Sequence, residues 1–179
     1  MSTTVITNKV RFSYCNLFEP KAPQGGGEPK YSVTLLISKN DTATVEKIKA
    51  AIAEARENYC ARNGANALPL KPNHTLRDGD GTRSSGEPFG PECKGCYVLN
   101  VSSKLKPAVF DIFNNPTSDP SEVYSGCYGR AKINFYGYSA NGNKGISAGL
   151  LGVRKLADGE PFGLSCSADD FADEDDFLG

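Results

Sequence analysis

Residues 127–138 carry two chemically different sets of side chains in strict alternation. The odd-numbered positions are small or apolar: Cys127, Gly129, Ala131, Ile133, Phe135 and Gly137. The even-numbered positions, which we call the 128–138 row, are aromatic, cationic or amide-bearing: Tyr128, Arg130, Lys132, Asn134, Tyr136 and Tyr138. Successive side chains of a β-strand point to opposite faces, so the pattern predicts a strand with one face on a core and the other in solvent.

The 128–138 row has the chemistry of a binding surface for single-stranded DNA. Same-face side chains recur about every 6.6–7 Å along a strand, close to the spacing of nucleotides in an extended single strand. Aromatic rings stack under bases of any sequence, and guanidinium and ammonium groups pair with phosphates. The alternative is an ordinary solvent face, on which the tyrosines only cover neighbouring strands.

Further cations lie in predicted loops or near strand ends, where a groove would collect them. They are Arg77, Arg83, Lys94, Lys104, Lys106, Lys144, Arg154 and Lys155. The predicted DNA-binding set contains, besides the row, Arg77, Arg83, Lys104, Lys106 and Lys144. Each of these cations alone is also compatible with a solvated surface position.

The last eleven residues, 169–179, contain six acids, two phenylalanines and no base. The whole chain has 20 basic and 21 acidic residues, so residues 1–168 have 20 basic and 15 acidic residues and a net charge of +5. Closely spaced like charges repel one another and bury almost nothing, so we predict a disordered tail. A tail that only increases solubility is one interpretation. The other is a segment that competes with DNA for a basic groove and binds a partner through Asp173, Glu174, Asp175, Asp176 and Phe177.

Candidate sites for metals and for catalysis are incomplete. Cys93 and Cys96 have the spacing of a zinc knuckle, but a structural zinc site needs four ligands, and His74 is the only histidine. Asp78 and Asp80 lie in a glycine-containing stretch that does not complete a calcium loop and suits a tight turn, with magnesium as an alternative. The sequence contains neither a nucleophile with its base nor a phosphate loop. We therefore expect a protein that is not an enzyme and has no cofactor, with zinc at the two cysteines as the alternative.

The composition is that of one globular domain followed by the tail. The 179 residues are 39% hydrophobic and 23% charged, which is enough to bury a core. No run approaches the roughly 18–20 apolar residues of a membrane helix, and the N-terminus lacks the features of a signal peptide. We expect a nucleic-acid-binding domain at residues 1–168 and a tail at 169–179, located in the cytoplasm, with the cysteines as thiols.

Local patterns predict six strands and one helix. In the first strand, residues 9–18, Val10, Phe12 and Tyr14 are expected on one side. Apolar residues recur at helical spacing from Val45 until Asn63-Gly64, behind several candidate N-caps. Residues 63–95 are rich in glycine and proline and predict a long irregular excursion. The other five strands are predicted at residues 30–38, 96–103, 108–113, 127–138 and 146–156.

These elements predict a mainly β protein, either a barrel or a sandwich. A barrel with the helix inserted after its second strand accommodates all of them. 

Four short stretches follow one another along the chain: Leu76-Arg-Asp-Gly-Asp80, Val123-Tyr-Ser-Gly-Cys-Tyr128, Gly142-Asn-Lys-Gly-Ile146 and Val153-Arg-Lys-Leu-Ala-Asp-Gly-Glu160. Together with the N-terminal strands, this ordered set resembles a family of phage single-stranded-DNA-binding proteins built on an OB-fold. The resemblance implies a barrel of five to six strands with long loops, a groove for single strands, and a role in phage DNA replication or recombination in the cytoplasm of an infected bacterium.

The acidic C-terminus is similar to the tails of replicative single-strand binders, which implies docking onto replication proteins. Here Leu178 and Gly179 follow Phe177, whereas many such tails end on phenylalanine. The competing hypothesis is a β-rich phage structural or regulatory interaction module that does not bind nucleic acid. Duplex DNA and RNA stay as alternative ligands, since stacking on a ring does not read the sugar.

Overall fold

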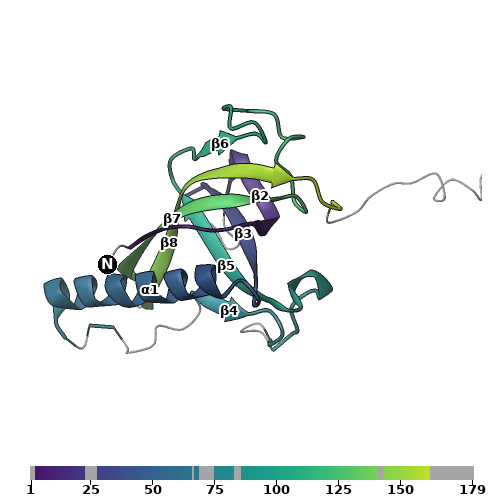
Figure 1. Ribbon diagram of the computed structural model, residues 1–179. Helices are drawn as coiled ribbons and strands as arrows, with labels where there is room; N and C mark the ends of the chain where they lie inside the picture. Colours follow the sequence, from purple (N-terminus) through teal and green to yellow (C-terminus); the bar gives the residue numbers. More distant parts are fainter. Residues whose placement is uncertain are drawn as a thin grey trace, which may run out of the picture.

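The strands form one hydrogen-bonded sheet that closes on itself (Figure 1). The computed structural model describes residues 3–22, 28–65, 67–68, 75–82, 86–140 and 143–161. The closed part runs in the order β2 (Val10–Lys21), β3 (Lys30–Ser38), β5 (Cys96–Ser103), β8 (Asn143–Ala157) and β7 (Tyr128–Ala140), and β7 returns to β2. These neighbours are antiparallel except β5 and β8, which meet in parallel at Ser102 and Gly149. The result is the five-stranded barrel of an OB-fold, as predicted.

Shorter elements extend the barrel. β1 (Thr4–Ile6) pairs with β7, β4 (Leu76–Asp78) pairs with β5, and β6 (Ala108–Phe110) pairs in parallel with β8. The short 3-10 helix η1 (Pro91–Cys93) precedes β5. In Figure 1, β6 lies at the top of the molecule and α1 (Thr42–Asn63) along the bottom.

Alternating apolar side chains fill the inside of the barrel. Phe12, Leu35, Leu99, Ile133 and Phe135 are all at most 1% exposed. They come from four of the five barrel strands, so the core is built from segments that are far apart in the sequence. The core face predicted for residues 127–138 is confirmed by the burial of Cys127, Ala131, Ile133 and Phe135.

The helix α1 follows β3, the second strand of the barrel, as predicted. It begins after Asp41, whose carboxylate accepts a hydrogen bond of 3.3 Å from the Thr44 N–H. Its apolar side packs on β7, and its Tyr59 ring lies so close to that strand that a Cβ at Gly137 would be 2.5 Å away from it. This close approach explains the glycine in the apolar half of the β7 pattern.

Tyr14 does not follow the predicted alternation. The pairing of β2 with β3 shifts register between Ser13 and Asn16, and Tyr14 has a φ of 48°, in the left-handed region. A bulge of this kind re-aims the side chain that it contains. Tyr14 is therefore 62% exposed and does not share the buried side of Val10 and Phe12. The prediction was wrong because alternation alone does not reveal a bulge.

Residues 63–95 hold more structure than predicted, since β4 and η1 both lie in this range. Phe89, Cys93 and Cys96 pack with Leu36 and Val98 in a small apolar cluster outside the barrel core, on β3 and β5. 

The predicted strand at residues 108–113 ends early, at Phe110, because Asp111 starts a turn: its side chain accepts hydrogen bonds of 2.9 Å from the N–H groups of Phe113 and Asn115. The predicted tail, His74 and Arg83 lie outside the described residues. Within the described chain, α1 is too polar to be a membrane-spanning helix.

Candidate nucleic-acid interface

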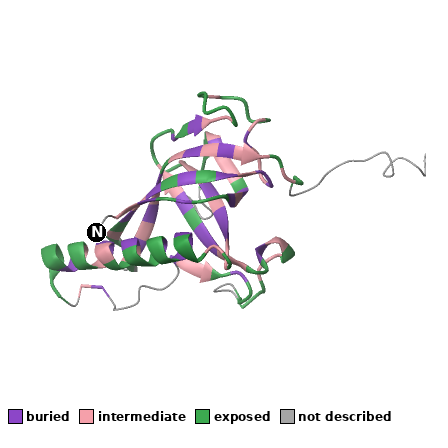
Figure 2. Cartoon of the chain, in the orientation of Figure 1, coloured by how far each residue is buried: buried purple, intermediate pink, exposed green. Residues whose placement is uncertain are grey.

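The 128–138 row lies on the outer side of the barrel. Along β7, Gly129, Ala131, Ile133 and Phe135 are buried, while the even-numbered positions between them are exposed or half-buried. Figure 2 shows this alternation as stripes along β7. From Tyr128 to Tyr138 the row extends over about 33 Å, at about 3.3 Å per residue. The strand therefore offers a continuous outward line of rings, cations and one amide.

Tyr136 and Tyr138 lean over glycines of the neighbouring strand. A Cβ on Gly149 would lie 3.3 Å from Cε1 of Tyr136, and one on Gly145 would lie 3.3 Å from Cε1 of Tyr138. Because β8 has no side chain at either position, the rings rest against its backbone and keep 44% and 37% of the residue surface exposed. Two aromatic rings are thus held in place while much of their surface stays in solvent.

Arg130 and Lys132 occupy the middle of the row, and both are exposed. The Nε of Arg130 donates a hydrogen bond of 2.8 Å to the Thr7 carbonyl, which fixes the base of the guanidinium against the chain that leads from β1 to β2. In the described part of the molecule neither cation forms an ion pair. The carboxamide oxygen of Asn134 is already used, because the hydroxyls of Thr3 and Thr4 donate to it at 2.9 and 3.3 Å.

Tyr128 differs from the other two rings of the row. Lys9 Nζ lies 4.9 Å from its ring centre and the Arg11 guanidinium carbon 5.3 Å, both over the ring. The residue is half-buried, and a Cβ at Gly159 would lie 2.9 Å from its Cε2. Tyr128 therefore brings Lys9 and Arg11 to the end of the row but offers little open ring of its own.

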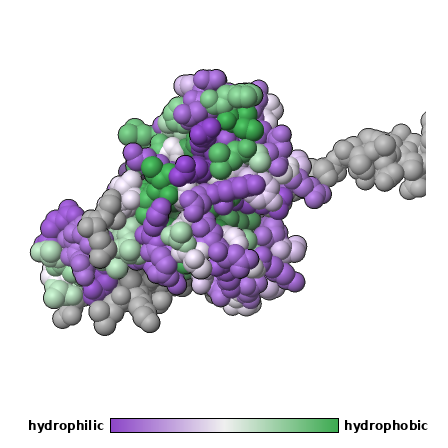
Figure 3. Space-filling model, in the orientation of Figure 1, coloured by the Kyte–Doolittle hydropathy of each residue, from purple (hydrophilic) through white to green (hydrophobic). Residues whose placement is uncertain are grey.

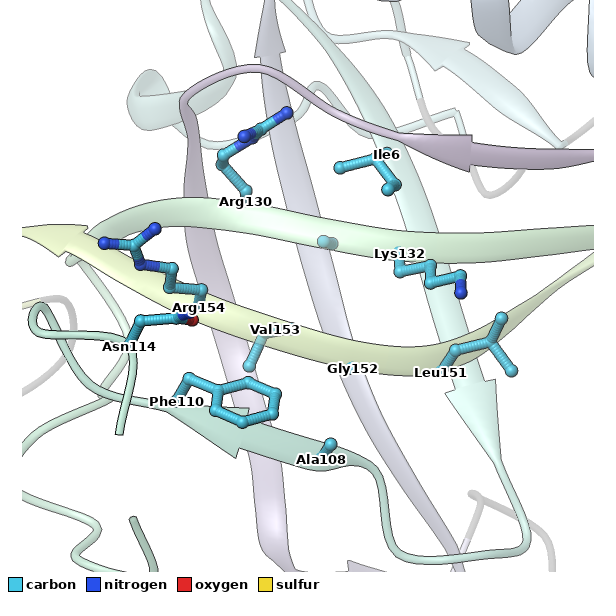
Figure 4. Close-up of a pocket in the computed structure, with 11 residues that line it drawn as sticks. Ile6, Ala108, Phe110, Asn114, Arg130, Lys132, Leu151, Gly152, Val153 and Arg154 are labelled. Carbon is cyan, nitrogen blue, oxygen red and sulfur yellow. The ribbon is translucent and has the colours of Figure 1, made fainter. Parts of the chain in front are cut away.

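A pocket of about 540 Å³ adjoins the row between β7, β8 and β6 (Figure 4). Arg130 and Lys132 line it from β7, Arg154 from β8 and Phe110 from β6. In Figure 3, hydrophobic side chains gather in the upper part of the molecule, where β6 lies, and hydrophilic side chains border them. In the sequence, Arg154 was one of several cations with no assigned place. The structure brings it next to Arg130 and Lys132 of the row.

The remaining predicted cations are spread over the surface. Lys104 and Lys106 are exposed in the loop before β6, and Lys104 forms an ion pair of 3.2 Å with Glu28. Lys144 is exposed near the start of β8, and Lys94 is exposed after η1. Arg77 is on β4, in register with Val98 of β5, and two strands, β5 and β8, lie between β4 and β7.

Lys155 is not a surface cation as the sequence suggested, since it is 6% exposed. Its Nζ lies 2.6 Å from Asp158 and 3.7 Å from Glu122. Burial, the largest single influence, lowers its pKa, but the hydrogen bond to Asp158 and the negative charges of Asp158 and Glu122 together outweigh it, so the pKa is raised above its ordinary value. Lys155 therefore ties the end of β8 to the loop before β7 and is not available to a phosphate.

The two candidate metal motifs are engaged in other contacts. Asp78 and Asp80 both bind Lys39 Nζ, at 2.6 and 2.7 Å, and this bond lowers the pKa of both carboxyl groups. Cys93 is buried and Cys96 half-buried in the small apolar cluster, and burial raises the pKa of the Cys96 thiol. Among the described residues, no group of three potential metal ligands surrounds either motif.

Two exposed aromatic residues were missed by the strand argument. Tyr14 is displayed by the bulge of β2, for which the sequence has no local signal. Phe113 is 80% exposed at the turn after β6, and Arg154 Nη2 donates to the neighbouring Ile112 carbonyl at 3.1 Å. The signal for Phe113 was available, because an apolar ring beside the Asn-Asn-Pro sequence of a turn is seldom buried.

The comparisons with known proteins agree with this geometry. The family model described as Enterobacter phage Enc34, ssDNA-binding protein, matches residues 3–178. The chain belongs to this family. The family is defined by DNA binding and not by a reaction, in agreement with the prediction that the chain is not an enzyme. The resemblance seen in the sequence is thereby confirmed.

Solved structures and a curated relative extend the match. The single-stranded DNA-binding protein of bacteriophage Enc34 in complex with ssDNA superposes with a TM-score of 0.79 at 32% identity, over 90% of each chain. The T7 protein gp2.5, a single-stranded DNA-binding protein, shares the fold at 16% identity, with a TM-score of 0.61 over 96% of this chain and 93% of that one. Putative protein p50 of Acyrthosiphon pisum secondary endosymbiont phage 1 is 38% identical over 174 residues, 93% of this chain and 91% of the relative.

Proposed function

We propose that this protein binds single-stranded DNA along the 128–138 row, largely without sequence preference, and does not catalyse a reaction. The observation that carries the proposal is the placement of Arg130, Lys132, Tyr136 and Tyr138 on one outward line of β7. Along this line two cations for phosphates, Arg130 and Lys132, are followed after Asn134 by two rings for bases. The similar Enc34 protein has been crystallised with ssDNA, which supports the same ligand class for this chain.

The alternative path for the DNA is the outer face of the second and third barrel strands, where OB-folds commonly bind oligonucleotides. Here those strands are β3 and β5. Part of their outer face is covered by the cluster of Phe89, Cys93 and Cys96. The part beyond it has small polar groups, such as the Thr34 hydroxyl that donates to the Asn100 carboxamide at 2.8 Å. The 128–138 row is longer and has two exposed cations, Arg130 and Lys132, beside its two exposed rings, so we favour it as the path of the DNA.

The direct test is binding of a labelled oligothymidylate over a series of salt concentrations, compared with duplex DNA, RNA and a neutral polymer. We expect tight binding to the single strand that weakens as salt rises, because released counterions drive association with phosphates. Binding no better than to the neutral polymer at low salt would refute the proposal. A flat salt dependence would argue for a protein-interaction module in its place.

We further infer that the protein protects single-stranded DNA during phage replication or recombination. The supporting sequence feature is the acidic segment 169–179, whose charge is opposite to that of residues 1–168. In this proposal the tail competes with DNA for the cationic groove and recruits replication proteins through its acids and Phe177. DNA binding at the row releases the tail for those partners.

A further inference from the structure

The pocket beside the row is built from two lines of residues in register, one across four strands and one across three. Ile6, Lys132, Gly152 and Ala108 form one line through the pairings of β1, β7, β8 and β6. Arg130, Arg154 and Phe110 form the next line. Cross-strand partners share a face of the sheet, so both lines lie on the outer side with the 128–138 row. Figure 4 shows them around one hollow.

The hollow exists because β8 contains an irregularity at this place. The register of β7 and β8 shifts between Lys132 and Ile133, which pair with Gly152 and Leu150. Leu151 is the extra residue and is 47% exposed at the rim. Gly152 and Ala108, which follow Lys132 in the first line and form the floor, bring no large side chain into the hollow. Bulges often lie next to binding sites, where they re-aim a side chain in this way.

The pocket is cationic and therefore suits an anionic ligand. Arg130, Lys132 and Arg154 all line it, and none of the eleven lining residues is acidic. The Nε of Arg154 is buried and has no hydrogen-bond acceptor among the described residues, while its Nη2 is held by the Ile112 carbonyl. Asp111 directly follows the lining residue Phe110, but its carboxylate accepts hydrogen bonds from two backbone N–H groups of its own turn.

Apart from Asn114, the rest of the lining is apolar, which a phosphate alone does not require. Phe110 is half-buried and lies next to Arg154 in the second line, and Ile6 and Leu151 are 49% and 47% exposed at the rim. The volume of about 540 Å³ lies in the range of about 300–1,000 Å³ that is usual for small-molecule sites. A flat apolar group and an anion, covalently joined, satisfy both halves of the lining.

We propose that this pocket binds one nucleoside phosphate, with the base on Phe110 and the phosphate between Arg130, Lys132 and Arg154. The inference rests on the proposed function, since the nucleotide is either one unit turned out of the strand on β7 or a free mononucleotide. It adds a lateral subsite on β6 and β8, which the row by itself does not contain.

The test is a titration of the full-length ¹⁵N-labelled protein, followed at the backbone amides of Ala108 and Gly152 and of Tyr136 and Tyr138. The probes are an oligothymidylate, thymidine monophosphate, thymidine and inorganic phosphate. We expect the oligothymidylate to shift all four amides. If thymidine monophosphate also shifts Ala108 and Gly152, more than thymidine or phosphate does, the pocket accepts a free nucleotide. If only the oligothymidylate shifts them, the ligand is a unit of the strand; both outcomes support the pocket.

Two results would overturn the inference. If the oligothymidylate shifts the amides of Tyr136 and Tyr138 but leaves those of Ala108 and Gly152 unchanged, the pocket is empty in the complex while the proposed function stands. If phosphate shifts Ala108 and Gly152 as strongly as thymidine monophosphate, the site recognises an anion and not a nucleotide. If no amide responds to the oligothymidylate, the proposed function fails together with the pocket.

A pair of matched variants tests the hollow itself. Ala108→Leu fills the floor of the hollow from an exposed position of β6. Ala53→Leu adds the same side chain at an exposed position of α1. We expect Ala108→Leu to weaken oligothymidylate binding at least about fivefold, the lower limit for losing one stacked base, and Ala53→Leu to leave it unchanged. Equal affinities of the two variants would contradict the subsite. The titration of the unmodified protein decides the question if Ala108→Leu fails to fold.

Discussion

Tyr128 and Tyr136 occupy the same face of β7 but differ in what lies against their rings. Lys9 and Arg11 cover Tyr128, whereas Tyr136 leans over the backbone at Gly149 and is 44% exposed. Residue type and parity alone rank the two tyrosines equally. Only the neighbours make Tyr136 the better stacking platform and Tyr128 a support for two cations.

We predict that Tyr136→Ala weakens binding to oligothymidylate by about 1–3 kcal/mol, the contribution of one stacked base. The fold should persist, because the ring lies outside the barrel core. The matched control is Tyr14→Ala, which removes another exposed ring, from the bulge of β2. Fluorescence anisotropy measures the affinity, and thermal unfolding monitors the fold.

The opposite pattern is informative as well. If the bound DNA runs over β2, β3 and β5, Tyr14→Ala should weaken DNA binding and Tyr136→Ala should leave it unchanged. Unfolding of Tyr136→Ala would place this ring in the core and contradict the interface.

At the level of elements, β7 and β8 act as one unit, in which glycines of one strand accommodate tyrosines of the other. This pairing of a ring with a residue that lacks a side chain stabilises a cross-strand contact and sets the angle of the ring. The glycines at 145 and 149 are therefore part of the interface even though they carry no functional group.

We predict that Gly149→Ala weakens single-strand binding, because its Cβ would come within 3.3 Å of Tyr136 and displace the ring. A double-mutant cycle with Tyr136→Ala gives the test: once the ring is absent, Gly149→Ala should have no further effect on affinity. We expect a coupling of at least about 0.5 kcal/mol between the two positions. Additive effects would mean that the substitution acts on β8 itself.

A second element-level feature fastens the chain that follows β8. The Tyr124 hydroxyl donates to Asp158 at 3.0 Å, and Arg11 Nη2 donates to the Glu160 carbonyl at 2.9 Å. Together with the bond between Lys155 and Asp158, these contacts hold residues 158–160 against the loop before β7. Residues 158–160, which precede the acidic tail in sequence, therefore lie close to Arg11 and Tyr128, at the Tyr128 end of the row.

This arrangement predicts a specific dependence of stability on acid. The bond to Lys155, and then that to Tyr124, lowers the pKa of Asp158 below its ordinary 3.8. The ionised carboxylate therefore stabilises the folded state above the unfolded pKa, and this contribution is lost as the pH falls through the lower folded pKa. We expect Asp158→Asn to lower the urea midpoint at about pH 5 but to have little effect at about pH 2, where wild type has lost the same contribution. A constant difference between the two proteins over this range would contradict the assignment.

On the scale of the whole molecule, charge is divided between a body of +5 and a tail of six acids. The acidic tail competes with any polyanion for the cationic surface of the same chain. Salt weakens the binding of the tail and the binding of the polyanion. Residues 158–160, which precede the tail in sequence, lie at the Tyr128 end of the row.

We predict that deleting residues 169–179 tightens binding to oligothymidylate severalfold at low salt, and that the gain shrinks as salt rises. The control is a full-length protein in which the six acids are replaced by their amides, which keeps the length and removes the charge. It should match the deletion. Unchanged or weaker affinity of both variants would contradict competition by the tail.

The sequence by itself determined which side chains of β7 face outward, where α1 begins and ends, and how charge divides between body and tail. These properties depend on alternation, helical spacing and composition, which are local. The tertiary structure decided that Tyr128 is covered and Tyr14 is exposed, that Lys155 is buried, and that Arg154 and Phe110 join Arg130 and Lys132 around one pocket. Each of these outcomes depends on a bulge or on the register between strands far apart in the chain, and register is set by the packing of the whole barrel rather than by neighbours in sequence.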